Sequence, residues 1–124
     1  MPKAGADPTP QAQVADNSVA VEPSARLTKD FDRAMRGVYD RARTEAGYSA
    51  TYFLSMLAEH GGMGTARKLL QSPAVSDGFR ALWERGRLDL TAEALVLRDD
   101  FADLFTDDEI ELARRRLSEF GFYA

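Results

Sequence analysis

Apolar residues from residue 28 onward recur at steps of three and four, the spacing that places them on one face of an α-helix. The first run contains Phe31, Met35, Val38 and Ala42. No run shows the two-residue alternation and the β-branched enrichment of a β-strand. The pattern therefore predicts an all-α fold, a compact single domain of about five to seven short helices.

Glycine, proline and capping residues divide this pattern into segments. We expect helices at about 29–46, 50–60, 64–71, 77–85 and 92–98, then an apolar turn at 101–105 and a last helix that ends before Gly121. Ser49, Ser76 and Thr91 are the expected N-caps, because a hydroxyl can accept a hydrogen bond from a free N–H of the first turn. Trp83 is expected to anchor the core.

The last helix has the strongest local signature. Thr106 and Glu109 have the spacing of a capping box, in which each side chain accepts a hydrogen bond from the other residue's backbone N–H. Gly121 and Phe122 are placed to close a Schellman cap against Leu117.

Four of the five prolines fall within the first 25 residues, which contain no aromatic residue. Such a segment buries too little apolar surface to offset its ordering entropy. We therefore expect a disordered tail at 1–25 and a helical domain at 26–124. The start of the chain lacks the apolar run of a secretory signal, and no stretch is apolar enough to span a membrane, so a cytoplasmic protein is expected.

The composition excludes most familiar catalytic and metal-binding chemistry. The chain has no cysteine and one histidine, His60, so disulfides, thiolate nucleophiles and cysteine-based zinc sites are ruled out. Six carboxylates between Asp99 and Glu109 are dense, but they lack the ligand spacing of a calcium loop. A small metal-dependent enzyme that uses Glu59, His60 and these carboxylates is the least favoured alternative, and we expect no catalytic residue, metal or cofactor.

Charge is unevenly distributed along the chain. Residues 26–87 carry 11 basic against 7 acidic side chains, whereas from Leu88 to Glu111 nine acidic residues accompany Arg98 alone. The chain as a whole has a net charge of −4, which argues against binding nucleic acid through bulk charge. The basic region 26–87 and the acidic segment 88–111 are therefore candidate surfaces for a protein partner, or for each other in self-association.

Two features suggest nucleic acid as an alternative ligand. The glycine-rich turn at 61–68 could direct backbone N–H groups and a helix N-terminus at a phosphate. The segments within 64–85 have the lengths of a helix-turn-helix. The candidate nucleic-acid or partner-binding residues, taken over both features and the basic region, are Arg33, Arg36, Arg43, Gly62, Gly64, Arg67, Lys68, Arg80, Arg85 and Arg87.

Several segments of the chain resemble a family of small, uncharacterised bacterial helical proteins. The resemblance covers about residues 38–123 and is carried by the runs AEHGG at 58–62, TARKLL at 65–70, SDGF at 76–79, LWERGRLDLT at 82–91 and EALVL at 93–97, continued by Phe105, Thr106 and Glu109. It implies a compact helical domain and transfers no site or activity.

These observations favour a non-enzymatic binding or regulatory module. Protein–protein interaction through the basic region, the acidic segment or both is the leading hypothesis. DNA binding through 61–68 or 64–85 is the alternative. In a DNA complex the acidic segment would oppose the phosphate backbone, and no aromatic residue interleaves the basic ones.

Overall fold

The computed structural model describes residues 21–123, and within that range it contains α-helices and 3-10 helices but no strand. The all-α prediction is confirmed. The elements in chain order are α1 (Val21–Ala46), α2 (Thr51–Gln71), α3 (Asp77–Glu84), η1 (Leu88–Leu90), α4 (Ala92–Val96), η2 (Asp99–Leu104) and α5 (Asp107–Glu119). No helix of this described part is long and apolar enough to cross a membrane.

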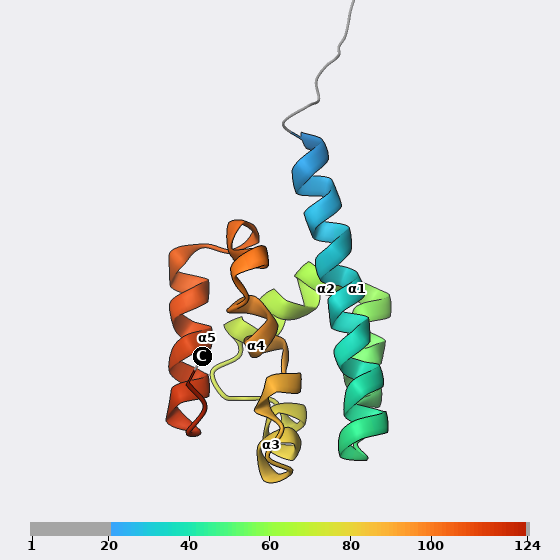
Figure 1. The fold of residues 1–124 in the computed structure, drawn as a ribbon, viewed down its shortest axis with the longest axis vertical. Coiled ribbons are helices and arrows are strands. Elements are labelled where there is room, and N and C mark those ends of the chain that lie inside the picture. Colours follow the sequence, from blue (N-terminus) through green and yellow to red (C-terminus); the bar gives the residue numbers. More distant parts are fainter. Residues whose placement is uncertain (1–20, 124) are drawn as a thin grey trace, which may run out of the picture.

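The short helix α4 lies between two layers of longer helices (Figure 1). On one side α1 runs beside α2, and on the other stands α5, while α3 lies at the end of the molecule away from the start of α1. Contacts join α4 to α1, α2 and α5, as well as to both 3-10 helices. The centre of the fold is therefore a helix of five residues that contacts α1, α2 and α5.

The main core forms where α1, α2, α4 and η2 meet. The Phe31 ring lies completely buried between two other rings, with its centroid 5.1 Å from that of Phe101 and 5.2 Å from that of Phe105, both edge to face. Met35, which is also fully buried, belongs to the same cluster. The apolar stripe expected on the first helix is thus the buried face of α1.

The first helix begins earlier than its expected start at residue 29. It begins at Val21, so 21–25, which we expected to be part of a disordered tail, are helical. Pro23 falls in the first turn, where a proline leaves no intrahelical hydrogen bond unmade. The rest of the expected tail, 1–20, lies outside the described residues.

The second and third expected helices form one element, α2, which is interrupted at Gly61. The backbone there has φ 71° and ψ 179°, so the expected break at the glycine pair is confirmed. The expected N-cap at Ser49 is wrong. The residue before the helix is Ala50, no side chain caps it, and the Ser49 carbonyl instead accepts a hydrogen bond from the Thr51 N–H in a tight turn.

The other expected caps are confirmed. The side chains of Ser76 and Thr91 accept hydrogen bonds from the N–H groups of Phe79 and Ala94, although α3 and α4 end before the expected 85 and 98. The capping box of Thr106 and Glu109 is present in full. At the end of α5, the Phe122 N–H donates to the Leu117 carbonyl and the Gly121 N–H to the Ser118 carbonyl, which is the Schellman pattern.

Trp83 is not a core anchor. Its side chain is 45% exposed, because the inner face of the short helix α3 is already occupied by Phe79 and Leu82. The indole lies against the end of α5, with its ring centroid 5.3 Å from that of Phe120.

Candidate functional site

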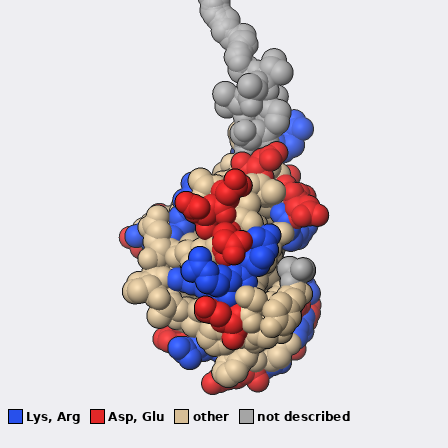
Figure 2. All heavy atoms as spheres, turned by 90° about the vertical axis from the view of Figure 1, so that its left-hand side faces the viewer, with Lys and Arg blue, Asp and Glu red and all other residues tan. Residues whose placement is uncertain are grey.

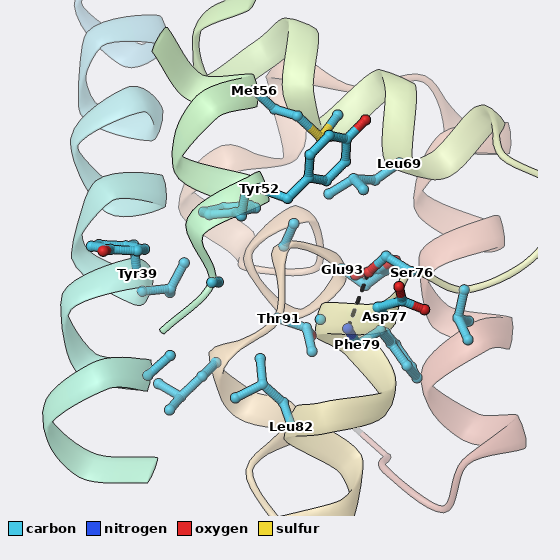
Figure 3. Close-up of a pocket in the computed structure, with 18 of the residues that line it drawn as sticks. Tyr39, Tyr52, Met56, Leu69, Ser76, Asp77, Phe79, Leu82, Thr91 and Glu93 are labelled. Carbon is cyan, nitrogen blue, oxygen red and sulfur yellow. Dashed lines mark hydrogen bonds between the residues drawn. The ribbon is translucent and has the colours of Figure 1, made fainter. Parts of the chain in front are cut away.

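A cavity of about 740 Å³ lies where the C-terminal half of α1, both ends of α2, the first turns of α3 and the start of α4 meet. This volume is within the range of small-molecule and side-chain binding pockets. Figure 3 shows Tyr52 and Met56 on one side of the cavity, Leu82 and Thr91 on the other, and Glu93 beside Ser76 and Asp77.

The cavity exists because α2 and α3 meet α4 at their ends. The chain between Gln71 and Asp77 leaves α2 in an extended turn that contains Pro73, which prevents the helix from continuing. Side chains from four helices then surround a space that no backbone fills. Most of the wall is apolar, and it includes Val38, Met56, Leu69, Phe79, Leu82 and Leu90.

One carboxyl group lies at this apolar wall. Glu93 is in the first turn of α4, directly after the Thr91 cap, and it is only 2% exposed. Its Oε2 atom has no hydrogen-bond partner among the described residues. Buried polar atoms in folded proteins almost always have such a partner, so this oxygen is an exception among the described residues.

Burial raises the pKa of Glu93 above its ordinary value of 4.5. Desolvation is the dominant cause, because a charged carboxylate loses its hydration when it is enclosed by apolar groups. A backbone hydrogen bond and the charge of Arg116 act in the opposite direction and do not compensate. A strongly perturbed acid in a cavity is a common property of functional sites.

Arg116 of α5 stands behind Glu93, but its hydrogen bonds are directed elsewhere. Its Nη1 donates to the Leu69 carbonyl at 2.7 Å, and its Nη2 donates to the Ser72 carbonyl. These are carbonyls at the end of α2, where a cation is favoured by the helix dipole. The distance from Arg116 Nη1 to Glu93 Oε2 is 3.8 Å, which is too long for a hydrogen bond.

The mouth of the cavity carries an exposed aromatic side chain. Tyr52, in the first turn of α2, lines the cavity and is 77% exposed. The other charged groups on the lining are Asp77 and Lys68, both solvent-accessible. With Glu93, the lining therefore has two carboxyl groups and one ammonium group.

Five of the candidate binding arginines, three in α1 and two that follow α3, are not among the residues that line this cavity and have partners within the chain. These contacts are Arg33 with Asp30 at 3.1 Å, Arg36 with Asp32 at 3.1 Å, Arg43 with Asp40 at 3.9 Å, Arg85 with the Ala46 carbonyl at 3.1 Å and Arg87 with Glu45 at 2.7 Å. Four of these five arginines therefore face an acidic side chain.

Gly62 and Arg67, from the glycine-rich turn, have structural partners. The Gly62 N–H donates to Asp32 Oδ1 at 2.8 Å, so a carboxylate already occupies the position that a phosphate would take. Arg67 donates to Glu109 at 2.9 Å and to the Leu104 carbonyl at 3.0 Å, and so joins α2 to the start of α5. The pKa of Glu109 is lowered: burial opposes the shift, but the Thr106 N–H and the Arg67 guanidinium outweigh it.

The three remaining candidates are not brought together. Lys68 lines the cavity, Arg80 is exposed on α3, and Gly64 packs closely on the His60 side chain. A second, shallower pocket of about 560 Å³ contains Arg33, Arg36 and Gly62, together with Lys29 and His60.

The acidic segment forms no metal site in the described residues, where no group of three or more possible ligands is found. Figure 2 shows acidic and basic side chains interleaved on the face of the molecule that carries α5. Asp107, Asp108 and Glu109 lie in the first turn of α5, as the capping interpretation predicts.

Sequence reasoning missed Glu93. The available signal was a single acidic residue within the apolar run Ala92–Val96. An acidic residue in the first turn of a helix is ordinary, because it complements the helix dipole, so the run alone did not distinguish a buried carboxyl group from an exposed one.

Comparison with protein-family models, with curated proteins and with solved structures finds no match to this chain. The resemblance to a bacterial family of small helical proteins therefore stays a prediction, and the functional argument depends on the cavity itself.

Proposed function

We propose that this protein is a non-enzymatic, cytoplasmic binding module that holds a segment of a partner protein at the cavity around Glu93. The observation that carries the proposal is a cavity of about 740 Å³ that has the exposed aromatic ring of Tyr52 among its lining residues.

A protein segment suits the mouth of the cavity better than an enclosed small molecule does. Tyr52, which lines the cavity, is 77% exposed. Aromatic side chains at the edge of a cavity are enriched in protein interfaces, where they supply contact area at a low entropic cost. A partner protein that inserts one side chain into the cavity would cover the Tyr52 ring with its own backbone next to that side chain.

This proposal retains protein binding as the function but gives the cavity priority over the basic region. Arginines that face Asp30, Asp32, Asp40 or Glu45 have their positive charge partly balanced within the chain, which weakens the attraction of the basic region for an acidic partner.

The test is site-specific photo-cross-linking of the full chain in its native host. A photoreactive phenylalanine at position 52 is expected to form a covalent adduct with a defined protein. The matched control carries the photoreactive phenylalanine at position 114 instead. This position is exposed on α5 and lies outside the cavity lining. Adducts of equal yield at both positions, or none at position 52, would contradict the proposal.

Nucleic acid remains the second candidate function because the shallow pocket gathers Lys29, Arg33, Arg36 and His60 beside the glycine-rich turn. Its test is a titration of labelled duplex DNA at two salt concentrations. Phosphate binding weakens steeply with salt. This alternative is supported if the affinity for DNA decreases at the higher salt concentration and is also lower in the variant R33A/R36A than in the wild type. The absence of DNA binding at low salt would remove it.

A further inference from the structure

We infer that Glu93 and Arg116 form a pH-sensitive switch in the wall of the cavity. While Glu93 is protonated, Arg116 holds the carbonyls at the end of α2, as it does in the structure. When Glu93 loses its proton, the guanidinium group moves towards Oε2 and its bonds to the end of α2 weaken. The switch is a property of the fold, and its effect on a partner rests on the proposed function.

One guanidinium group faces acceptors on two helices. Arg116 Nη1 lies 2.7 Å from the Leu69 carbonyl oxygen and 3.8 Å from Glu93 Oε2, while Nη2 donates to the Ser72 carbonyl. The guanidinium group is planar and rigid, so a movement of Nη1 towards Oε2 disturbs its bonds to these carbonyls. A short displacement of one side chain therefore strengthens a contact with α4 at the expense of α2.

The Leu69 carbonyl depends on Arg116 for a hydrogen-bond donor. Within a helix this carbonyl would accept from the N–H four residues later, but that residue is Pro73, which has no N–H. The Ser72 N–H donates to the Lys68 carbonyl. A weaker bond from Arg116 therefore loosens a link that ties the end of α2 to α5.

The charge of Glu93 selects between the two arrangements. Glu93 is 2% exposed and Arg116 is 7% exposed, so water screens the attraction between the two ionised groups very little. A buried carboxylate is costly unless it is paired, and a charge-assisted hydrogen bond from Arg116 offsets this cost. A protonated carboxyl group has no such need of a cation. Burial raises the pKa of Glu93, so the protonated form persists above the ordinary range of a glutamate.

The other ionisable groups around the cavity leave Arg116 as the partner of Glu93. α2 contributes the Lys68 ammonium group to the lining and α3 contributes the Asp77 carboxyl group, and both side chains are exposed, so water screens them. Neither 3-10 helix places a charged side chain on the described lining. Among the described residues, Arg116 is the charged side chain that acts on the pKa of Glu93. The remaining ionisable groups of the lining are uncharged hydroxyls, those of Tyr39, Tyr48 and Tyr52.

The switch reaches the cavity because Leu69, Ser72 and Glu93 all line it. In Figure 3 the Leu69 side chain projects into the cavity from α2, and Glu93 lies below it. The cavity as described has the end of α2 held by Arg116, which is the arrangement of the protonated form. The partner is therefore expected to bind more tightly below the midpoint of the Glu93 ionisation than above it.

The experiment follows the full, isotopically labelled chain by NMR from about pH 4 to about pH 9, a range that includes carboxyl groups whose pKa is raised by burial. The side-chain carboxyl carbon of Glu93 gives the midpoint of its ionisation. The carbonyl carbons of Leu69 and Ser72 are expected to shift upfield with the same midpoint, because each loses part of a hydrogen bond. These shifts are expected to disappear in Glu93→Gln and to persist in the matched control Asp77→Asn, which removes the other carboxyl group of the lining.

The outcomes separate the switch from the function that it controls. Carbonyl resonances that stay constant while Glu93 ionises overturn the switch, as does a Glu93 carboxyl group that keeps one charge state throughout the range. Shifts that survive in Glu93→Gln overturn it too, because another group then causes them. Cross-linking at position 52 with equal yield above and below the midpoint overturns control of binding by Glu93, whereas the proposed function stands.

Discussion

Arg116 Nη1 and Glu93 Oε2 lie 3.8 Å apart with both side chains buried, close enough for Coulomb attraction but too far for a hydrogen bond. A pair in such surroundings normally closes to hydrogen-bond distance, because each ion has given up its hydration. Here the arginine is held by carbonyls at the end of α2, and Glu93 Oε2 stays buried without a hydrogen-bond partner.

The raised pKa of Glu93 predicts a pH-dependent difference between the wild type and Glu93→Gln. The folded state holds the carboxyl proton more strongly than the unfolded state does, so this group's contribution to stability is fully present below pH 4.5 and is lost as pH rises through the folded pKa. The free energy of unfolding of Glu93→Gln, minus that of the wild type, is therefore expected to increase from pH 4.5 upward. Urea titrations at several pH values measure it, and a difference that does not change with pH would contradict the raised pKa.

Removal of Arg116 is expected to be strongly destabilising. Arg116→Met leaves Glu93 without its cation and leaves the Leu69 and Ser72 carbonyls without their donor, and the loss of one partner of a buried ion pair costs about 3–5 kcal/mol. The double variant Glu93→Gln/Arg116→Met is expected to recover part of this loss, because it contains no unpaired buried charge. Chemical denaturation of the four proteins gives the coupling energy, and strict additivity would mean that the two side chains do not interact.

Alanine at Gly62 is expected to destabilise the fold, whereas alanine at Gly37 is not. A Cβ at Gly62 would lie 2.8 Å from the Cα of Asp32, a backbone atom that cannot move aside without shifting α1. Such overpacking costs about 1–3 kcal/mol. A Cβ at Gly37 meets nothing within 4 Å and lies within a helix, so the substitution is expected to stabilise by about 0.5–1 kcal/mol. Thermal unfolding of both variants checks that alanine at Gly62 lowers the stability and alanine at Gly37 raises it.

The exposure of Trp83 predicts that its truncation is milder than that of Phe79. Phe79 is 2% exposed, and its replacement by alanine is expected to cost about 3–5 kcal/mol. Trp83 is 45% exposed and contributes its edge-to-face contact with Phe120, so Trp83→Ala is expected to cost about 1–2 kcal/mol. Equal losses of stability in the two variants would indicate that the indole is buried in solution.

The local features of this fold could be predicted because their causes are close together in the sequence. The capping box involves two residues three positions apart, and the Schellman cap at Gly121 involves residues at most five positions apart. The helix between them follows from the spacing of its apolar residues. Ser49 shows the limit of such reasoning, since a hydroxyl at a suitable position does not cap when a tight turn precedes the helix.

The contacts that determine the candidate site join residues far apart in the sequence. Arg116 and the Leu69 carbonyl are 47 positions apart, and the Gly62 N–H and Asp32 are 30 apart. Asp32 Oδ2 accepts from Arg36, four residues later in the same helix, whereas Asp32 Oδ1 accepts from the Gly62 N–H of another helix. A carboxylate with two oxygens can have one partner within its own helix and one beyond it, and sequence spacing reveals only the first.

The interruption of α2 at Gly61 divides that helix into two segments that are fastened in different ways. The segment after Gly61 is tied by directional bonds: Gly62 to Asp32, Arg67 to Glu109, and the end of the helix to Arg116. The segment before it contributes apolar contacts from Phe53 and Leu57 to the core, and such contacts are non-directional. Gly61 is therefore the boundary between a segment whose orientation is set by hydrogen bonds and ion pairs and a segment whose orientation is set by the shape of its apolar contacts.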